Sequence, residues 1–564
     1  MLNSRFSKFA TAFVSFASLL ALLMLSLTTM AAAQQIGSEN TAFVEPPVPH
    51  PNTTPCVVTL YSGLTFNDYS PRSFTYTPPA ACPGPWAKVI LEANFSITQG
   101  IQYDRTANIW IGPTNIYFGT TAEPQPGLGR SWHIERDLTD YTSIFTIPQA
   151  GTVDLFNIVN STYTGVLHGS ANILFYPVAP NQLPPRSASQ VIAFSGGPTG
   201  GTVALNNTTS LLEQTLTLPT NITDVYLDVF AQSQSSDEFW YTCVPNDVSS
   251  ELFSCGGTAF REAEVTIDGT PAGVSPVYPW IYTGGIDPYL WIPIPGVQTM
   301  NFRPYRVNLT PFAALLDDGQ PHTIALSVFN ADSYFSVTGS LLLYQDAQAT
   351  QFSGAVTENT LAVPVPNITE NIHTAQNGNV SGTVNTLSSH NFQISGYINT
   401  AAGPVTTTVA QNIGFTNLQQ FRITAAEYQQ DITQNTIVHS IVTTNNAGGH
   451  FVNTVNHNWP LKLNITVTYN SDGSGVQTTS SNQYFEQDSE ATRNGVATSF
   501  TLLQNRVTAT DGLEFNSSGQ ITGNENQSSG QRFFQSNSTG YCYSRSLQAA
   551  ANALTAIING EGCK

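Results

Sequence analysis

Short runs of alternating or continuously apolar residues recur along most of the chain, each bounded by Gly, Pro, Asn or Asp. Alternation with a period of two is the pattern of a half-buried β-strand, and apolar residues at helical spacing are almost absent. The pattern therefore predicts an all-β fold built from sandwiches of jelly-roll or related type. Clear examples are "AKVILEANFSI" (87–97), "ANIWIG" (107–112), "GTVDLFNIV" (151–159), "TDVYLDVFAQ" (223–232), "HTIALSVFNA" (322–331) and "TGSLLLYQD" (338–346).

Two breaks in this pattern divide the chain. Pro and Gly cluster at 180–201, where no apolar pattern persists, and beyond about residue 350 the chain is rich in Asn, Thr and Ser with thin strands. We expect a first β-sandwich at 34–195, a second at 196–348 and a further β-rich C-terminal region at 349–564. Within that region, Ala and Leu in "RSLQAAANALTAIING" (545–560) favour a short helix.

The N-terminal residues have the order of a secretory signal peptide. Arg5 and Lys8 precede a long apolar run, which ends in Ala31, Ala32 and Ala33. This predicts a cleaved signal over 1–33 and a protein that is secreted, extracellular or vacuolar by way of the secretory pathway. Because the apolar run is long, an uncleaved signal anchor is the alternative; with cleavage we expect no stable membrane association.

Six cysteines fall into three pairs that are close in sequence. In a secreted chain an even number at such spacing indicates disulfides, although the sequence does not fix their connectivity. Metal ligation is the alternative, but the chain has no C-x-x-C and its nine His are scattered. We therefore expect neither a metal nor another cofactor. The pairs are Cys56 with Cys82, Cys243 with Cys255, and Cys542 with Cys563.

Charge is scarce and acidic, with 18 Lys and Arg against 37 Asp and Glu in 564 residues and a formal net charge of -19. Nucleic-acid binding depends on basic clusters that neutralise phosphates, and none is visible, so nucleic acid is excluded as a partner. Taken by itself, the pair Asp104 and Arg105 directly before a predicted strand is most simply a partly exposed ion pair at the rim of a sandwich. The surrounding motifs change this interpretation.

The motifs around and after this pair have a familiar order. They include "QYDRTANIWIG" (102–112), "TAEP" (121–124), "SWHIERDLTDYTSIF" (131–145), "DEFWY" (237–241), "FREAEVTIDGTPAG" (260–273), "PWIYTGGIDPYLWIPI" (279–294) and "DDGQPHTIALSVFN" (317–330). Over roughly residues 50–350 this order resembles the peptide-N-glycanase A family of plants and fungi. The resemblance implies an amidase that cleaves the bond between Asn and the first GlcNAc of an N-glycan. It also implies N-glycosylated peptides or proteins as partners, an acidic optimum and no metal.

A more distant similarity is to the bacterial peptide-N-glycosidase F, a protein of two adjacent jelly rolls. "YDRTAN" is similar to a segment of that enzyme whose Asp is the principal catalytic residue, which implies this role for Asp104. "DEFWYTC" and "AFREAEVTIDG" resemble a second segment split by an insertion, which implies a catalytic role for Glu238 and a substrate-binding role for Arg261. A third acidic residue should fall near 155–159, where this chain has Asn157.

The chemistry gives its own reason for carboxylates. Amide hydrolysis needs an activated water, a donor for the developing oxyanion and a proton for the leaving amine. Neither a Ser-His-Asp order nor G-x-S-x-G stands out. Beside Arg105 we expect Asp104 to stay ionised as a base. Packed against Phe239 and Trp240, Glu238 can keep its proton as an acid. One site holds both only if the two sandwiches pack side by side around a shared cleft.

Further residues are candidates for substrate binding. Glu123 precedes Pro in a loop and either lines the cleft or caps a turn. Arg105 directly follows Asp104 in the sequence. Trp132 and Trp240 are our choices for exposed rings that stack on sugars, although large rings in sandwiches are more often core. Asp287, in a Gly-rich loop beside two Trp, is a candidate glycan contact.

Two non-enzymatic alternatives remain at this stage. One is a glycan-binding or cell-surface sandwich protein that keeps the fold without catalysis, and the other is a structural wall or adhesion protein suggested by the C-terminal composition. The presence of both Asp104 and Glu238 in their motifs favours the enzyme, since a binding module has no need of either.

Overall fold

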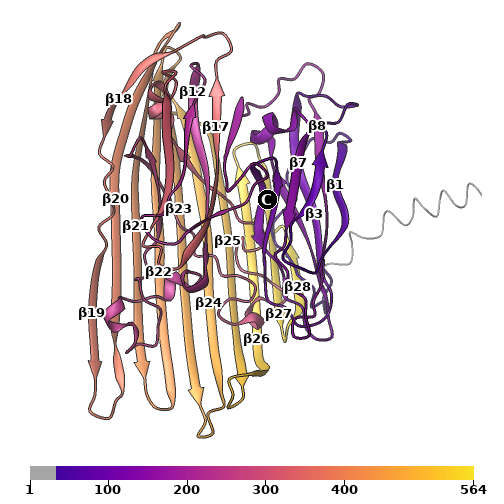
Figure 1. Ribbon diagram of the computed structural model, residues 1–564, viewed down its shortest axis with the longest axis vertical. Helices are drawn as coiled ribbons and strands as arrows, with labels where there is room; N and C mark the ends of the chain where they lie inside the picture. Colours follow the sequence, from indigo (N-terminus) through magenta and orange to yellow (C-terminus); the bar gives the residue numbers. More distant parts are fainter. Residues whose placement is uncertain (1–33, 564) are drawn as a thin grey trace, which may run out of the picture.

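The computed structural model describes residues 34–563, so the predicted signal peptide lies outside the described residues. The all-β prediction is confirmed: every strand pairing in this range is antiparallel, and no helix in it is longer than seven residues. Figure 1 shows a first sandwich in indigo, a second in magenta and a large sheet of long strands in orange to yellow. Within residues 34–563 no helix is long and apolar enough to cross a bilayer.

The first sandwich has the strand order of an eight-stranded jelly roll. One sheet runs β1 (Cys56–Phe66), β8 (Leu167–Pro177), β3 (Trp86–Ile97), β6 (Arg130–Asp137). The other runs β2 (Arg72–Tyr76), β7 (Gln149–Asp154), β4 (Thr106–Ile111), β5 (Thr114–Thr120). Alternate residues of β8 are buried, as the period-two pattern requires, and they join one apolar cluster with the rings of Tyr76, Phe145 and Phe175. The short helix η1 (Thr139–Phe145) lies between β6 and β7.

The second sandwich repeats this order. One sheet runs β10 (Val203–Leu205), β17 (Tyr334–Gln345), β12 (Ile222–Gln234), β15 (Tyr305–Asn308), with β9 (Gln190–Phe194) on β17. The other runs β11 (Leu212–Thr217), β16 (Pro321–Phe329), β13 (Glu262–Ile267), β14 (Thr270–Pro276). Its short helices are η2 (Ser235–Asp237), η3 (Trp240–Thr242), α2 (Asn246–Ser249), η4 (Pro288–Trp291), η5 (Thr310–Phe312) and α3 (Ala313–Leu316).

The C-terminal region forms one 11-stranded sheet in which each strand from β20 onward pairs with the next along the chain. Its central strands are long, and β21 alternates strictly, with Ile413, Phe415, Asn417 and Gln419 on the buried face. The strands are β18 (Ser353–Asn359), β19 (Asn367–Thr374), β20 (Val380–Thr400), β21 (Gly403–Ile423), β22 (Glu427–Asn446), β23 (Gly449–Tyr469), β24 (Gly475–Arg493), β25 (Val496–Phe515), β26 (Ile521–Asn537), β27 (Cys542–Ala550) and β28 (Ala553–Asn559).

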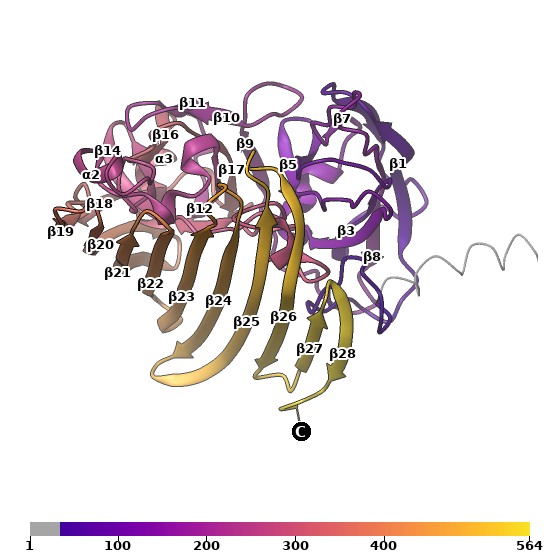
Figure 2. The ribbon, with the colours of Figure 1, turned by 90° about the horizontal axis from the view of Figure 1, so that it is seen from below.

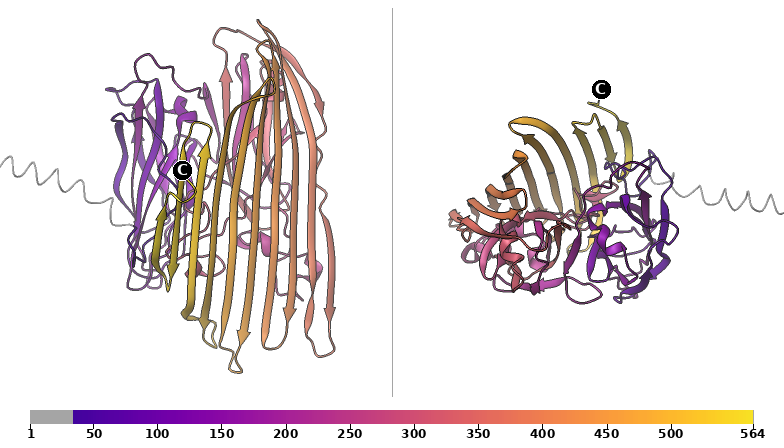
Figure 3. Two further views of the ribbon diagram at one scale, coloured as in Figure 1. Left: turned by 180° about the vertical axis from the view of Figure 1, so that it is seen from behind. Right: turned by 90° about the horizontal axis from the view of Figure 1, so that it is seen from above.

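The two jelly rolls lie side by side, and the large sheet curves along the second one (Figure 2). The views from behind and from above agree, showing the sheet as a curved wall (Figure 3). Phe415 of the sheet lies 5.1 Å from the ring of Phe260, and apolar residues of both units form one continuous cluster. The second jelly roll therefore has an interface on each side, one with the first jelly roll and one with the sheet.

The helix predicted over 545–560 is wrong, because this segment is the hairpin β27–β28. Leu547, Ala549 and Leu554 are buried on one face of the sheet, and this packing outweighs the intrinsic helix preference of Ala and Leu. Ala551 and Asn552 both have positive φ, 49° and 63°, as a two-residue hairpin turn requires.

Disulfides join Cys56 to Cys82, Cys243 to Cys255 and Cys542 to Cys563. The second closes the loop that follows η3, immediately after the segment that carries Glu238.

Candidate active site

Asp104 and Glu238 come from different jelly rolls to one interface. Asp104 lies two residues before the first residue of β4, and Glu238 follows β12 after the single turn η2. The amides of Gln232 and Gln234, at the end of β12, both donate to Thr106 Oγ1 at the start of β4, each at 3.3 Å. The two strand ends therefore meet, which is the arrangement that a shared site requires.

Glu123 is the direct partner of Asp104. The backbone N–H of Asp104 donates to Glu123 Oε1 at 3.0 Å, and the two carboxyl groups hydrogen-bond to each other. Gly284, from the loop before η4, approaches both. A Cβ at Gly284 would lie 2.1 Å from Glu123 Oε1 and 2.7 Å from Asp104 Oδ1, so only glycine fits. The two ends of the β4–β5 hairpin and the distant loop of Gly284 thus enclose one carboxyl pair.

Burial governs the protonation of this pair. Desolvation raises the pKa of Asp104, and the positive charge of Arg105 offsets only part of that effect. Desolvation also raises the pKa of Glu123, and the neighbouring Asp104 charge raises it further. The expectation that Arg105 keeps Asp104 ionised at mildly acidic pH is therefore wrong. Instead the pair holds one shared proton over a wide pH range, with Asp104 the more acidic member.

The contacts of Arg105 explain its limited effect. Its guanidinium donates to Gln102 Oε1 and lies over the ring of Tyr163, 5.9 Å from the centroid. Arg105 thus places a positive charge beside the site, with a buried Nε that has no hydrogen-bond partner among the described residues.

Glu238 is the second acid. Burial, and next to it the charge of Asp104, raise the pKa of Glu238 to about 8. The direction is the one expected from its apolar neighbours. Tyr282 lies near both carboxyl groups. Burial is the largest cause of its raised pKa, and the charges of Glu238 and Asp104 each raise that pKa further. Its hydroxyl donates to the Ser233 carbonyl at 2.5 Å, which fixes the ring beside the site.

The turn that carries Glu238 is anchored by a buried ion pair. Arg261 Nε donates to Asp237 Oδ1 at 2.9 Å, and both side chains are inaccessible to solvent. Asp237 Oδ2 also accepts from the backbone N–H groups of Asp332 and Ser333, at 2.9 and 2.8 Å. Arg261, predicted to bind substrate, is enclosed in the protein and instead positions the residue before Glu238.

Both tryptophans predicted to be exposed are core residues. Trp132 is 3% exposed and stacks on Phe95 at 5.5 Å, because it occupies an inward position of β6. Trp240 is 1% exposed and lies 6.1 Å from Phe415 of β21. The large sheet covers Trp240, and the sequence around Trp240 does not predict this contact.

Asp287 is also covered by the sheet. It is fully buried, and Asp511 of β25 is its acidic neighbour: the two carboxyl groups hydrogen-bond, and burial and mutual repulsion raise the pKa of Asp287. The predicted glycan contact is therefore wrong. Asp287 Oδ1 accepts the Tyr289 N–H at 3.0 Å and so shapes the loop that carries Gly284.

The residue at the position where a third acid was expected is structural. Asn157 is fully buried, and its amide donates to the carbonyls of Phe66 and Gly165 at 2.8 and 3.1 Å. Glu123, from another loop, supplies a third carboxyl group instead. The sequence named Glu123 as a candidate but gave no sign of its pairing with Asp104, and it missed Tyr282 and Gly284. The Gly–Gly pair in "YTGGIDP" was the available signal for the latter.

The set comprises a proton-sharing carboxyl pair, a third carboxyl group that keeps its proton to neutral pH and above, and a guanidinium. Such a set can accept a proton at one place and deliver a proton at another, which is general acid–base chemistry.

Comparisons with known proteins bear on this region. The model of the family Peptide N-acetyl-beta-D-glucosaminyl asparaginase amidase A matches residues 46–362, which is more than half of the chain and includes every site residue above. A Peptide-N4-(N-acetyl-beta-glucosaminyl)asparagine amidase A of Prunus dulcis is 28% identical over 397 residues, 66% of this chain and 68% of that protein.

Two solved structures are also similar to the chain. PNGase F, a glycosylasparaginase from Flavobacterium meningosepticum, has a TM-score of 0.34 at 13% identity and covers 52% of this chain and 96% of its own. PNGF-II has a TM-score of 0.36 at 10% identity and covers 52% of this chain and 65% of its own. Both TM-scores are too low to carry an argument about the site. On the extent of the sequence match, the chain belongs to the peptide N-acetyl-beta-D-glucosaminyl asparaginase amidase A family.

Proposed function

We propose that this protein hydrolyses the amide between Asn and the first GlcNAc of N-glycans on peptides or unfolded proteins, giving Asp and a glycosylamine. The observation that carries the proposal is the convergence of Asp104, Glu123 and Glu238 from two jelly rolls, within the region matched by the amidase family. An acid–base set without a Ser or Cys nucleophile suits direct attack by water.

In the first step, the ionised carboxylate of Asp104 takes a proton from a water molecule, whose oxygen bonds to the amide carbon. The hydrogen bond from Glu123 stabilises the charge on Asp104 before the step, and the shared proton lets the pair accept a second one. The oxyanion that forms needs donors, and the unpartnered Nε of Arg105 is the buried donor available at this edge of the site.

In the second step, the bond between carbon and nitrogen breaks. Glu238 gives its proton to the nitrogen, so the glycosylamine leaves as a neutral amine. The peptide keeps the new Asp carboxyl group, and the proton held by the Asp104 pair returns to Glu238 through solvent. The raised pKa of Glu238, about 8, keeps this acid protonated at neutral pH.

The test is incubation of the purified protein with a defined glycopeptide in oxygen-labelled water, followed by mass spectrometry. Amide hydrolysis leaves an Asp peptide with label in its side-chain carboxyl group. Cleavage between the first two sugars leaves one sugar on an unlabelled Asn and contradicts the proposal, as does an unchanged glycopeptide.

We also propose that the protein works in the secretory pathway or outside the cell. Three disulfides support this proposal, because such bonds persist in oxidising compartments. So does a sequon such as Asn94, which lies exposed on β3.

A further inference from the structure

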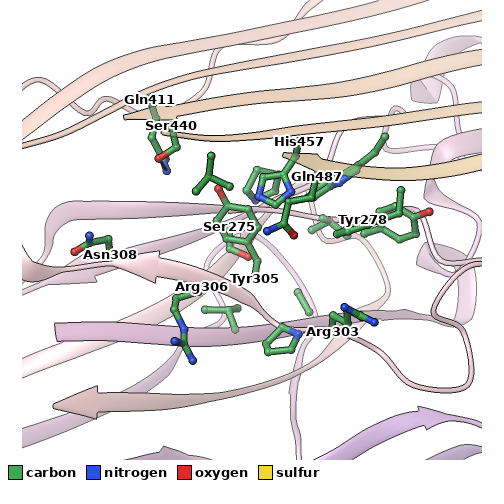
Figure 4. A pocket seen from close by; sticks show the side chains of 18 of the residues that line it. Ser275, Tyr278, Arg303, Tyr305, Arg306, Asn308, Gln411, Ser440, His457 and Gln487 are labelled. Carbon is green, nitrogen blue, oxygen red and sulfur yellow. Dashed lines mark hydrogen bonds between the residues drawn. The ribbon is translucent and has the colours of Figure 1, made fainter. Parts of the chain in front are cut away.

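A second cavity lies away from the carboxyl groups, between the second jelly roll and the large sheet. Its volume is about 330 Å³, within the range of small-molecule sites. Figure 4 shows its wall: Gln411, Ser440, His457 and Gln487 project from the sheet, and Ser275, Tyr278 and Tyr305 face them from the jelly roll. None of the three catalytic carboxyl groups lines it.

The wall combines aromatic faces with uncharged hydrogen-bonding groups. Tyr305, His457 and Trp459 form a contiguous ring cluster, with centroid separations of 5.7 Å between Tyr305 and His457 and 5.4 Å between His457 and Trp459. Among the described residues, His457 Nδ1 and Trp459 Nε1 are buried without hydrogen-bond partners. Unpaired buried donors and acceptors are costly, so a ligand that carries hydroxyl groups would be favoured over an apolar one.

The lining carries no free charge. Arg303 and Arg306 are its only Lys, Arg, Asp or Glu residues, and Arg303 is paired with Glu45 at 3.0 Å. Arg306 is paired with Asp228 at 2.7 Å and with Asp140 at 2.6 Å. Burial lowers the pKa of His457 to about 4, against the charge of Asp488, so its ring is neutral at mildly acidic pH. An ionic ligand therefore finds no counter-charge here.

One short stretch of the chain runs from the wall of the cavity to the active site. Trp280 lines the cavity, and Gly284, four residues later, touches Asp104 and Glu123. A segment of this length spans at most about 15 Å. An oligosaccharide of a few sugar units can cover that distance.

We propose that the cavity binds neutral sugar residues of the N-glycan, at a subsite separate from the three carboxyl groups. A pyranose has the required combination of apolar ring faces and neutral hydroxyl groups. The identification of the sugar as part of the substrate rests on the proposed function, whereas the binding of sugar to this cavity does not.

The first experiment measures binding of a mannose trisaccharide, free of peptide, by calorimetry and by saturation-transfer NMR. Gln487→Leu removes an amide from the wall, and we expect the trisaccharide to bind about tenfold more weakly, equivalent to about 1.4 kcal/mol. Asn453→Ala, at the exposed rim, is a second variant less able to disturb folding. Gln504→Leu is the matched control, because Gln504 pairs with Glu486 on the opposite face of the sheet and should bind as wild type.

A wild-type protein that does not bind the trisaccharide at millimolar concentration would overturn the proposal. So would binding that Glu238→Gln abolishes and neither cavity variant weakens. If the sugar binds and the cavity variants weaken it while no glycopeptide is cleaved, the subsite stands and the proposed activity fails. If glycopeptides are cleaved, the ratio of KM for a one-sugar substrate to KM for a full-glycan substrate should fall about tenfold in Gln487→Leu. An unchanged ratio would remove this cavity from substrate binding.

Discussion

The two interfaces of the second jelly roll are built from different chemistry. The interface with the first jelly roll is ionisable: it holds the three carboxyl groups that we propose to be catalytic and, farther along, Tyr141 donating to Asp228 at 2.8 Å. The interface with the large sheet is joined mainly by neutral amides, together with one ion pair between His390 and Glu262 at 3.1 Å. Side chains of the sheet donate to backbone carbonyls of the jelly roll, among them Asn417 to Tyr241, Gln419 to Cys243, Gln430 to Thr242, Gln483 to Pro279 and Gln527 to Ile292.

This difference in chemistry indicates a different role for each interface. An amide side chain satisfies a buried carbonyl without changing charge, so the sheet stays attached over a wide pH range. Buried carboxyl groups are costly to ionise, and they are retained where protons must move. Predictions that separate activity from stability therefore test the comparison directly.

The largest expected effect is on the rate of Asp104→Asn. Asn keeps the shape of Asp but cannot take a proton from water, and general-base assistance is typically worth about 10²- to 10⁴-fold. We expect a loss of that size in kcat/KM on a glycopeptide, with an unchanged circular dichroism spectrum. Asp68→Asn, an exposed acid of the same jelly roll, is the control. A variant that keeps more than about a tenth of the rate would end the assignment of Asp104 as the base.

Next in size is the dependence of the rate on pH. The reaction needs Asp104 ionised, and its pKa is raised above the ordinary value of about 3.9, so the rate should fall on the acid side well before that value. It needs Glu238 protonated, so the rate should also fall as the pH rises through about 8. The optimum should thus lie nearer to neutral than the family resemblance implies. In Glu238→Gln most of the rate should be lost, and any alkaline limb that remains should come from Glu123, whose pKa is also raised to about 8. A Glu238→Gln variant that keeps its rate would make another group the acid.

Substitutions in the interface with the large sheet should lower the free energy of unfolding. Gln419 is fully buried: its amide donates to the Cys243 carbonyl at 2.8 Å, and its Oε1 accepts from Gln430 at 2.8 Å. Gln419→Leu leaves the Cys243 carbonyl buried and unpaired, at about 1–3 kcal/mol, and removes one of the two acceptors of the Gln430 amide, which still donates to Thr242. We expect a lower midpoint of urea unfolding, with Gln420→Leu, on the outer face of β21, unchanged. Equal midpoints would mean that the amide contacts contribute little to attachment of the sheet.

Much of this organisation could be predicted from the sequence. Period-two alternation identified the strands, and the motifs around Asp104 and Glu238 identified the two acids. The wrong predictions share one cause: the packing of a residue depends on segments that are distant from it in sequence. The large sheet buries Trp240, and its packing turns 545–560 into a hairpin. The pairing of Glu123 with Asp104 follows from the register of the β4–β5 hairpin, which sets Thr106 opposite Thr120, whereas Gly284 comes from a distant loop. The raised pKa of Asp104 follows from this enclosure rather than from its neighbour in sequence.

The smallest effect concerns the buried acid pair Asp287 and Asp511, an ionisable contact in the interface with the sheet. Another is the ion pair of His390 with Glu262, at 3.1 Å. Burial raises the pKa of both carboxyl groups, and their mutual repulsion raises that of Asp287 further. Tyr289 and Glu525 are the other ionisable groups nearby. The folded protein therefore binds protons more tightly than the unfolded chain. Stability contributed by the pair is present at low pH and is lost as the pH rises from about 3.9, the ordinary Asp value, through the raised values.

Asp511→Asn should reduce this loss, because it removes the repulsion on Asp287 while burial still raises the pKa of that carboxyl group. An amide keeps a hydrogen bond to Asp287 without the second charge, so we expect the Tm of the variant to match wild type at mildly acidic pH and to exceed it by roughly 3 °C at alkaline pH. Thermal unfolding across the pH range measures this, with Asp431→Asn, on the outer face of β22, as the matched control. Parallel Tm curves for wild type and Asp511→Asn would show that the pair does not titrate between the folded and unfolded states.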